Sequence, residues 1–202
     1  MTPDTKTTKS ELTRAAIIGA GMDLVAAEGL EALTLQAVAD RVGLSKSGVF
    51  SRVGSRETQQ KAVVEEFGRR FLAEVFTPAM QQPKGLPRLD AIVERWIARL
   101  ARPEPHHGCI YIPGAFELDD REGELRDFLL QEITRWRAAL RRSVLQSVES
   151  GHLRADTAPE QLVGEIYGIA IGLLHDARFL RDPGAPARAR SSWQRLRASY
   201  LA

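Results

Sequence analysis

The chain has 202 residues, of which 44% are apolar and 27% charged, and its net charge at pH 7 is +2. This length is enough to bury a substantial core in one or two domains. No run approaches the ~20 apolar residues that span a bilayer, and the first ten residues lack the apolar segment of a signal peptide. We therefore expect a cytoplasmic protein with no membrane association. The single cysteine, Cys109, excludes an intrachain disulfide.

All the elements that the sequence predicts are helices, because no stretch alternates apolar and polar residues as a half-buried strand would. Residues 1–9 are polar and are expected to form a flexible arm. A helix then runs from about Ser10 to Glu28, and Gly29 ends it. Its predicted apolar face consists of Leu12, Ala16, Ile17, Ala20, Leu24 and Ala27.

Residues 34–53 predict two short helices joined by a tight turn. Thr34 is suited to cap the first helix, in which apolar residues recur at helical spacing. Gly43 follows where the chain can adopt a left-handed conformation, and Ser45 can cap the second helix. So short a connection forces the two helices to cross at a large angle, which is the geometry of a helix-turn-helix.

The second of these helices carries hydrogen-bond donors suited to phosphates and base edges. The window from Arg41 to Arg56 contains basic residues and no acidic one, which an ordinary pair of packed helices would not explain. We predict that this helix enters the major groove of DNA, that Thr34 and Arg56 hold phosphates, and that Phe50 contacts a thymine methyl. The predicted DNA-binding residues are Thr34, Lys46, Ser47, Phe50, Ser51, Arg52 and Arg56.

Further helices are predicted from their apolar spacing and from the Gly, Pro and Asp residues that bound them. They run from Ser55 to about Phe76, from Leu89 to Leu100, from Glu122 to about Ser150, from about Pro159 to Leu180, and from Pro186 to Tyr200. A loop precedes the long helix that begins at Glu122. In it, Cys109 is expected to turn inward at the start of a short helix.

His106, His107 and Cys109 lie close together in this loop and raise the possibility of a metal or an enzyme. Adjacent donors on a short loop rarely converge on one ion, and no second cysteine is present to complete a site, so neither a metal nor a cofactor is expected. The alternative of a helical enzyme would use these residues or His175. No nucleophile elbow, phosphate loop or zinc-protease motif supports it, and we expect no enzymatic activity.

Three glycines recur at every fourth position of the helix from Pro159 to Leu180. Each glycine in a helix interior costs ~1 kcal/mol relative to alanine, and a closely approaching helix would compensate for that cost. The same helix is apolar nearly all round, so it needs cover on more than one side. We expect it to form a dimer interface with the last helix. A helix of the same chain or a ligand cavity are the alternatives for the glycines. The expected interface residues are Gly164, Gly168, Gly172, Trp193 and Leu196.

The N-terminal part of the chain resembles the TetR family of bacterial transcriptional repressors. The resemblance is close from Thr13 to about Glu65 and weaker in the stretches that begin at Glu117 and Gly151. It rests on T-R-x-x-I-I-x-A from Thr13, A-x-G from Ala27, Thr34, G-L-S-K-S-G-V-F from Gly43 and G-S-R-E from Gly54. The chain departs from the family pattern at Phe50, where Tyr is usual, and at Arg52 and Val53, where His and Phe are usual.

The resemblance implies an all-α protein with an N-terminal three-helix helix-turn-helix DNA-binding domain, residues 10–70, and a C-terminal helical ligand-binding and dimerisation domain, residues 71–202. It implies a repressor whose homodimer binds a palindromic operator in double-stranded DNA and releases it when a small molecule binds. The apolar C-terminal helices suggest a hydrophobic effector. Its expected contacts are Phe67, Phe71, Trp96, Cys109, Phe116, Trp136, Tyr167, Ile171 and His175.

Overall fold

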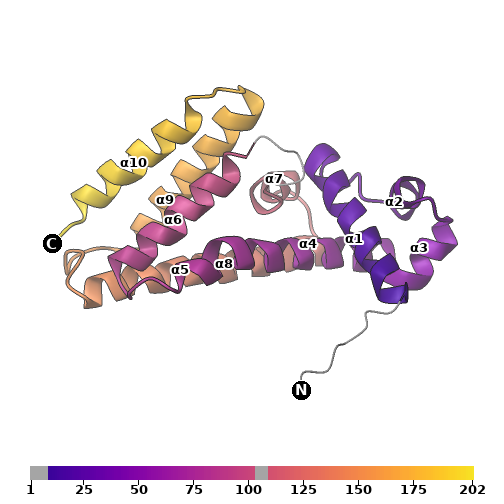
Figure 1. The fold of residues 1–202 in the computed structure, drawn as a ribbon, viewed down its shortest axis with the longest axis horizontal. Helices are drawn as coiled ribbons and strands as arrows, with labels where there is room; N and C mark the ends of the chain where they lie inside the picture. The colour runs from indigo at the N-terminus through magenta and orange to yellow at the C-terminus, as the bar shows by residue number, and fades with distance from the viewer. Residues whose placement is uncertain (1–8, 103–108) are drawn as a thin grey trace, which may run out of the picture. The chain divides into compact units, whose positions relative to one another are not determined.

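The computed structural model describes residues 9–102 and 109–202, and within them it contains helices and no β-strand (Figure 1). This confirms the expected all-α fold. No helix of the described residues is both long and apolar enough to cross a lipid bilayer. The chain divides into two compact units. The first contains the described residues up to Gly68 together with Ile110–Leu129, and the second contains the rest.

The first unit consists of the N-terminal helices and one short helix from the middle of the chain. The segment Ile110–Leu129, which we expected in the C-terminal domain, is part of this unit. We call residues 29–34 the α1–α2 loop. The helices are α1 Lys9–Glu28, α2 Leu35–Val42, α3 Lys46–Val53, most of α4 Arg56–Phe71 and α7 Tyr111–Glu117, followed by the first turns of α8 Glu124–Glu149. The last three residues of α4 belong to the second unit.

Helix α1 buries only part of the predicted face. Ile17 and Leu24 are buried as predicted, whereas Leu12 is 60% exposed and Ala16 and Ala27 are also exposed. The buried face also includes Gly21, where a Cβ would lie only 2.7 Å from Val63 Cγ2 of α4. The glycine therefore lets α4 approach this side of α1 closely. The buried residues of α1 are Ile17, Ile18, Gly21, Met22, Leu24 and Val25.

The second unit contains the remaining helices, of which α6, α9 and α10 lie side by side (Figure 1). Helix α6 contacts both α9 and α10, so its buried face forms the centre of this unit. Two π-helical segments directly continue α-helices. The elements are η1 Leu72–Phe76, α5 Thr77–Ala79, α6 Leu86–Leu100, most of α8, α9 Pro159–Leu174, η3 His175–Phe179 and α10 Ala185–Ser199.

Two helix boundaries that lie near prolines differ from the predicted ones. The helix that was expected to end before Thr77 continues through η1 and α5 to Ala79. Pro78 lies within this continuous helix, directly after the π-helical segment. Likewise α6 begins at Leu86 instead of Leu89, with Pro87 in its first turn.

Candidate DNA-binding and effector sites

The turn between α2 and α3 has the local geometry that the sequence predicted. The Thr34 hydroxyl accepts a hydrogen bond from the Ala37 N–H at 3.1 Å, which caps α2, and the Ser45 hydroxyl caps α3 in the same way. Gly43 ends α2 with a φ of 65°. Ala39 of α2 and Val49 of α3 are completely buried. These features confirm the helix-turn-helix.

Helix α3 leaves one face open to solvent. Val49 and Val53 are buried, so the opposite side of the helix projects outward, and Phe50 is 56% exposed. Arg52 Nη1 donates a hydrogen bond to the Gly48 carbonyl at 2.8 Å, within its own helix. The arginine can exchange this exposed bond for one to another molecule. The structure brings together Lys46, Ser47, Phe50, Ser51 and Arg52 on this exposed surface.

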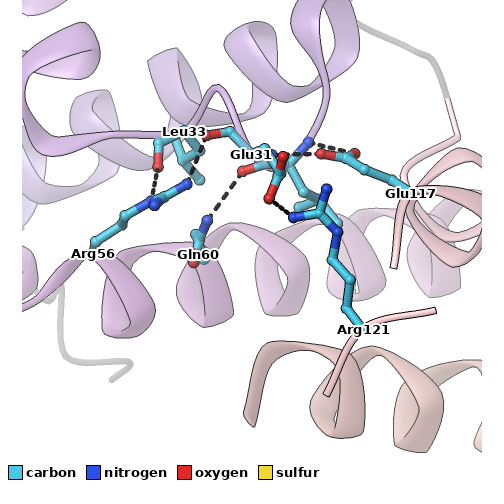
Figure 2. A network of polar contacts seen from close by, with 7 residues as sticks. Glu31, Leu33, Arg56, Gln60, Glu117 and Arg121 are labelled. Atoms are coloured by element: carbon cyan, nitrogen blue, oxygen red, sulfur yellow. Dashed lines mark hydrogen bonds and ion pairs between the residues drawn. The ribbon is translucent and has the colours of Figure 1, made fainter. Parts of the chain in front are cut away.

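Arg56, which we expected to hold a phosphate, is bonded to the α1–α2 loop. Its Nε donates to the Leu33 carbonyl at 3.1 Å, and its Nη2 donates to the Glu31 carbonyl at 2.7 Å (Figure 2). One turn further along α4, Gln60 Nε2 donates to the Leu30 carbonyl at 3.0 Å. Helix α4 thus holds the loop by its carbonyl groups, a role for Arg56 and Gln60 that the sequence pattern did not indicate.

The amide side of the same loop is held by α7. Both carboxylate oxygens of Glu117 accept backbone N–H groups, from Leu30 at 2.8 Å and from Glu31 at 2.6 Å (Figure 2). Arg121 forms an ion pair with the Glu31 side chain. None of these contacts was predicted, because they join residues more than 80 positions apart and two of them end on backbone groups.

Four of the residues proposed to contact an effector meet in the core of the second unit. We call Phe71, Trp96, Trp136 and Tyr167 the aromatic cluster. The ring centroids of Phe71 and Trp136 lie 4.7 Å apart, those of the two tryptophans 5.4 Å, and those of Trp96 and Tyr167 5.0 Å. All three pairs pack edge to face, the arrangement that aromatic quadrupoles favour.

The aromatic cluster contains polar groups that lack a partner. The indole N–H groups of Trp96 and Trp136 are buried and make no hydrogen bond to any described residue. Most buried polar groups in proteins are satisfied, so each exception calls for an explanation. On the border of the cluster, the Arg137 guanidinium lies 4.5 Å from the centroid of Tyr167. The cluster is therefore mostly apolar but contains two N–H donors that an acceptor on a ligand can satisfy.

The remaining residues of the proposed effector site lie elsewhere. Phe67 belongs to the first unit, where it packs on Tyr111, and so does Phe116, which is 62% exposed on α7. Ile171 is 38% exposed, and the exposed His175 ring is bonded to Asp176. Cys109 is buried, whereas His106 and His107 lie outside the described residues.

The glycines of α9 lie on an open face. No atom comes within 4 Å of a Cβ placed on Gly164, Gly168 or Gly172, so no helix of the described chain covers them. Two of these glycines, Gly168 and Gly172, line a groove of about 510 Å³ between α9 and α10, together with Leu196 of α10. Trp193, which we expected at the dimer interface, is instead part of the core. Its side chain is buried, and its indole N–H donates to Asp90 of α6 at 3.1 Å. It therefore offers no surface to a second chain.

Comparisons with known proteins agree with this architecture. The family model described as the tetracyclin repressor-like C-terminal domain matches residues 85–193. A TetR-family regulator from Cytophaga hutchinsonii has a similar structure, with 17% identity, 98% of each chain covered and a TM-score of 0.80. A TetR regulator from Chloroflexus aurantiacus is 20% identical over 96% of this chain and 99% of its own, with a TM-score of 0.79.

A third similar structure is that of AibR in complex with isovaleryl coenzyme A and operator DNA. It is 19% identical, covers 80% of this chain and 85% of its own, and has a TM-score of 0.66. No curated protein sequence matches the chain. The structural matches establish the fold, and the family model covers more than half of the 202 residues. The chain therefore belongs to the TetR family of transcriptional regulators.

Proposed function

We propose that the protein is a homodimeric repressor that binds a palindromic operator through α3 and releases it when a small apolar molecule binds. The observation that carries the proposal is the exposed face of α3. Basic, hydroxyl and aromatic side chains project together from a helix that is capped and packed on its other side. An α-helix fits the major groove, where lysine and arginine recognise guanine and apolar groups contact the thymine methyl.

Two copies are needed for useful specificity. An eight-residue recognition helix such as α3 reaches only a few base pairs, and dimers of this kind place two such helices about 34 Å apart, one turn of DNA. The uncovered glycine face of α9 supports an association of two chains there, because it lets backbones approach closely. In a two-fold dimer, the same face of each chain would meet the other.

The aromatic cluster is the proposed effector site. Its buried indole N–H groups favour a ligand with an apolar body and at least one hydrogen-bond acceptor, such as a carbonyl or carboxylate. AibR, a protein of similar fold, has a structure that contains isovaleryl coenzyme A, in which a short apolar acyl chain ends in a thioester carbonyl. We do not propose an enzyme. Of the residues considered for catalysis, the structure describes Cys109, whose thiol is buried, and His175, whose imidazole is exposed.

The test is a gel-shift assay on the DNA that flanks the protein's own gene, with a salt series. Lys46→Ala on α3 should weaken operator binding by about 1–3 kcal/mol. Lys84→Ala is the matched control, because it removes the same charge from an exposed residue of the second unit. Equal affinities for both variants would contradict the assignment of α3, and the absence of specific binding by the unaltered protein would refute the proposed function.

A further inference from the structure

The α1–α2 loop is held by a carboxylate on a helix far away in the sequence. Glu117 binds the N–H groups of Leu30 and Glu31 with one oxygen each, at 2.8 and 2.6 Å (Figure 2). Such charge-assisted hydrogen bonds are shorter and stronger than those between neutral groups. The loop has no helical or strand bonds of its own at these two amides, so Glu117 supplies the partners that secondary structure would otherwise provide.

The backbone of the loop is shaped to admit this carboxylate. Gly29 has a φ of 91°, which side-chain-bearing residues rarely adopt. A Cβ at Gly29 would also lie only 2.9 Å from Glu117 Oε2 and 3.2 Å from Oε1. The positive φ favours glycine at this position, and an added Cβ would displace the Glu117 carboxylate from the two amides.

Helix α7 also packs directly on the loop. Leu30 is 1% exposed, and a Cβ on Gly114 of α7 would lie 2.7 Å from Leu30 Cδ1. The absence of a side chain at Gly114 thus brings α7 close enough for Glu117 to reach the amides. By sequence, α7 lies inside the region that the C-terminal family model matches, although it packs within the first unit.

The loop is therefore bound on two sides by two helices. Helix α4 holds its carbonyl groups through Arg56 and Gln60, and α7 holds its amides through Glu117. The loop ends at Thr34, which caps α2, the first helix of the helix-turn-helix. A displacement of α7 would break the hydrogen bonds of Glu117 and leave those of Arg56 and Gln60 in place. The loop that leads into α2 would then be held by α4 alone.

We propose that Glu117 is a positioning residue for operator binding, through which α7 controls the orientation of the helix-turn-helix. The proposal rests on the proposed function as a DNA-binding regulator. Glu117 touches no DNA in this scheme. It acts by fixing the α1–α2 loop, and a change at α7 that withdraws the carboxylate lowers the affinity for the operator.

The test compares Glu117→Gln with Glu124→Gln. Glutamine keeps the shape of glutamate but provides only one acceptor oxygen for the two amides. Glu124 is in the same unit and forms an exposed ion pair with Lys61 at 2.6 Å, so its replacement removes the same charge without touching the loop. We expect about a tenfold loss of operator affinity for Glu117→Gln and no more than a twofold change for Glu124→Gln.

Binding to a non-specific duplex distinguishes positioning from general loss of structure. Glu117→Gln should retain non-specific binding, because its phosphate-binding residues are unchanged, and faster hydrogen exchange should appear at the amides of Leu30 and Glu31. Glu117→Asp serves as a second variant that keeps the charge. Its side chain is one methylene shorter and cannot reach both amides, so it should also lose operator affinity.

Three results would overturn the inference. The first is unchanged operator affinity of Glu117→Gln with unchanged exchange at Leu30 and Glu31. The second is an equal loss of specific and non-specific binding in both Glu117 variants, together with a lower melting temperature, which would indicate unfolding. If the unaltered protein bound no operator at all, the proposed function would fail first and this inference with it, whereas the other two results leave the proposed function intact.

Discussion

Replacement of Gly168 by Ala tests whether the open face of α9 binds a second chain. In the isolated chain, no atom lies within 4 Å of the added methyl group. Alanine should therefore stabilise the helix by up to ~1 kcal/mol, which for a chain of this size raises the melting temperature by roughly 2–4 °C. This gain applies equally to the monomer and the dimer and does not by itself change the dissociation constant of the dimer.

In a dimer with α9 at its interface, the same methyl group meets a closely packed backbone. Insertion of a methyl group into a well-packed interior costs about 1–3 kcal/mol. A two-fold axis presents the substitution twice, so the dimer should lose about 2–6 kcal/mol. The dissociation constant would then rise by at least about 30-fold.

Gly19→Ala on α1 is the matched control, since a Cβ at Gly19 also has no neighbour within 4 Å and lies outside the proposed interface. Sedimentation over a range of concentrations measures dimer dissociation, and thermal melting measures the stability of the helices. We expect both variants to fold and only Gly168→Ala to dissociate more readily. If Gly168→Ala dimerised as tightly as Gly19→Ala, the glycine face would be free in the dimer and the reasoning would be wrong.

Three further predictions concern stability and DNA binding. Gly21→Ala should lower the free energy of unfolding measured in urea by up to about 2 kcal/mol, because its Cβ would lie 2.7 Å from Val63 Cγ2 and the overpacking exceeds the gain in helix propensity. Arg56→Ala should lower that free energy by about 1–3 kcal/mol through loss of its two loop bonds, and it should reduce the salt slope of operator binding by about one ion only if Arg56 also holds a phosphate. Hydrogen bonds from Arg188 and from the Gly184 N–H lower the pKa of Asp182. The stabilisation of the fold by this carboxylate is therefore present above its ordinary pKa of about 3.9 and is lost as the pH falls further. Melting temperatures between pH 3 and 6 should show this loss in the unaltered protein and a smaller one in Arg188→Ala.

The helix-turn-helix could be predicted from the sequence because its determinants are local. Thr34 and Ser45 each cap a helix by accepting an N–H group three residues ahead, and Gly43 adopts its left-handed conformation at the end of α2. Such interactions depend on residue type and short spacing, and both can be read from a single sequence.

The contacts of the α1–α2 loop could not be predicted in this way. Glu117 binds backbone amides 86 and 87 positions away, and every residue offers a backbone amide except proline. The basic character of Arg56 likewise suggested a phosphate, whereas its position beside the loop carbonyls gives it partners within the chain. In α1, apolar spacing favoured Leu12, but the buried face follows Gly21, where the absence of a side chain admits α4.

The aromatic cluster has a composition that a plain core would not need. A phenylalanine would bury a similar ring without a donor, whereas a buried indole N–H without a partner costs about 1–3 kcal/mol. The indole N–H groups of Trp96 and Trp136 have no partner among the described residues. An acceptor on a bound effector would remove this cost. Among apolar ligands of equal size, those with a carbonyl or carboxylate should therefore bind about tenfold more tightly than the corresponding hydrocarbons. Tryptophan fluorescence can follow the titration. If hydrocarbon and carbonyl ligands quenched it with equal dissociation constants, the two indole N–H groups would have no part in effector recognition.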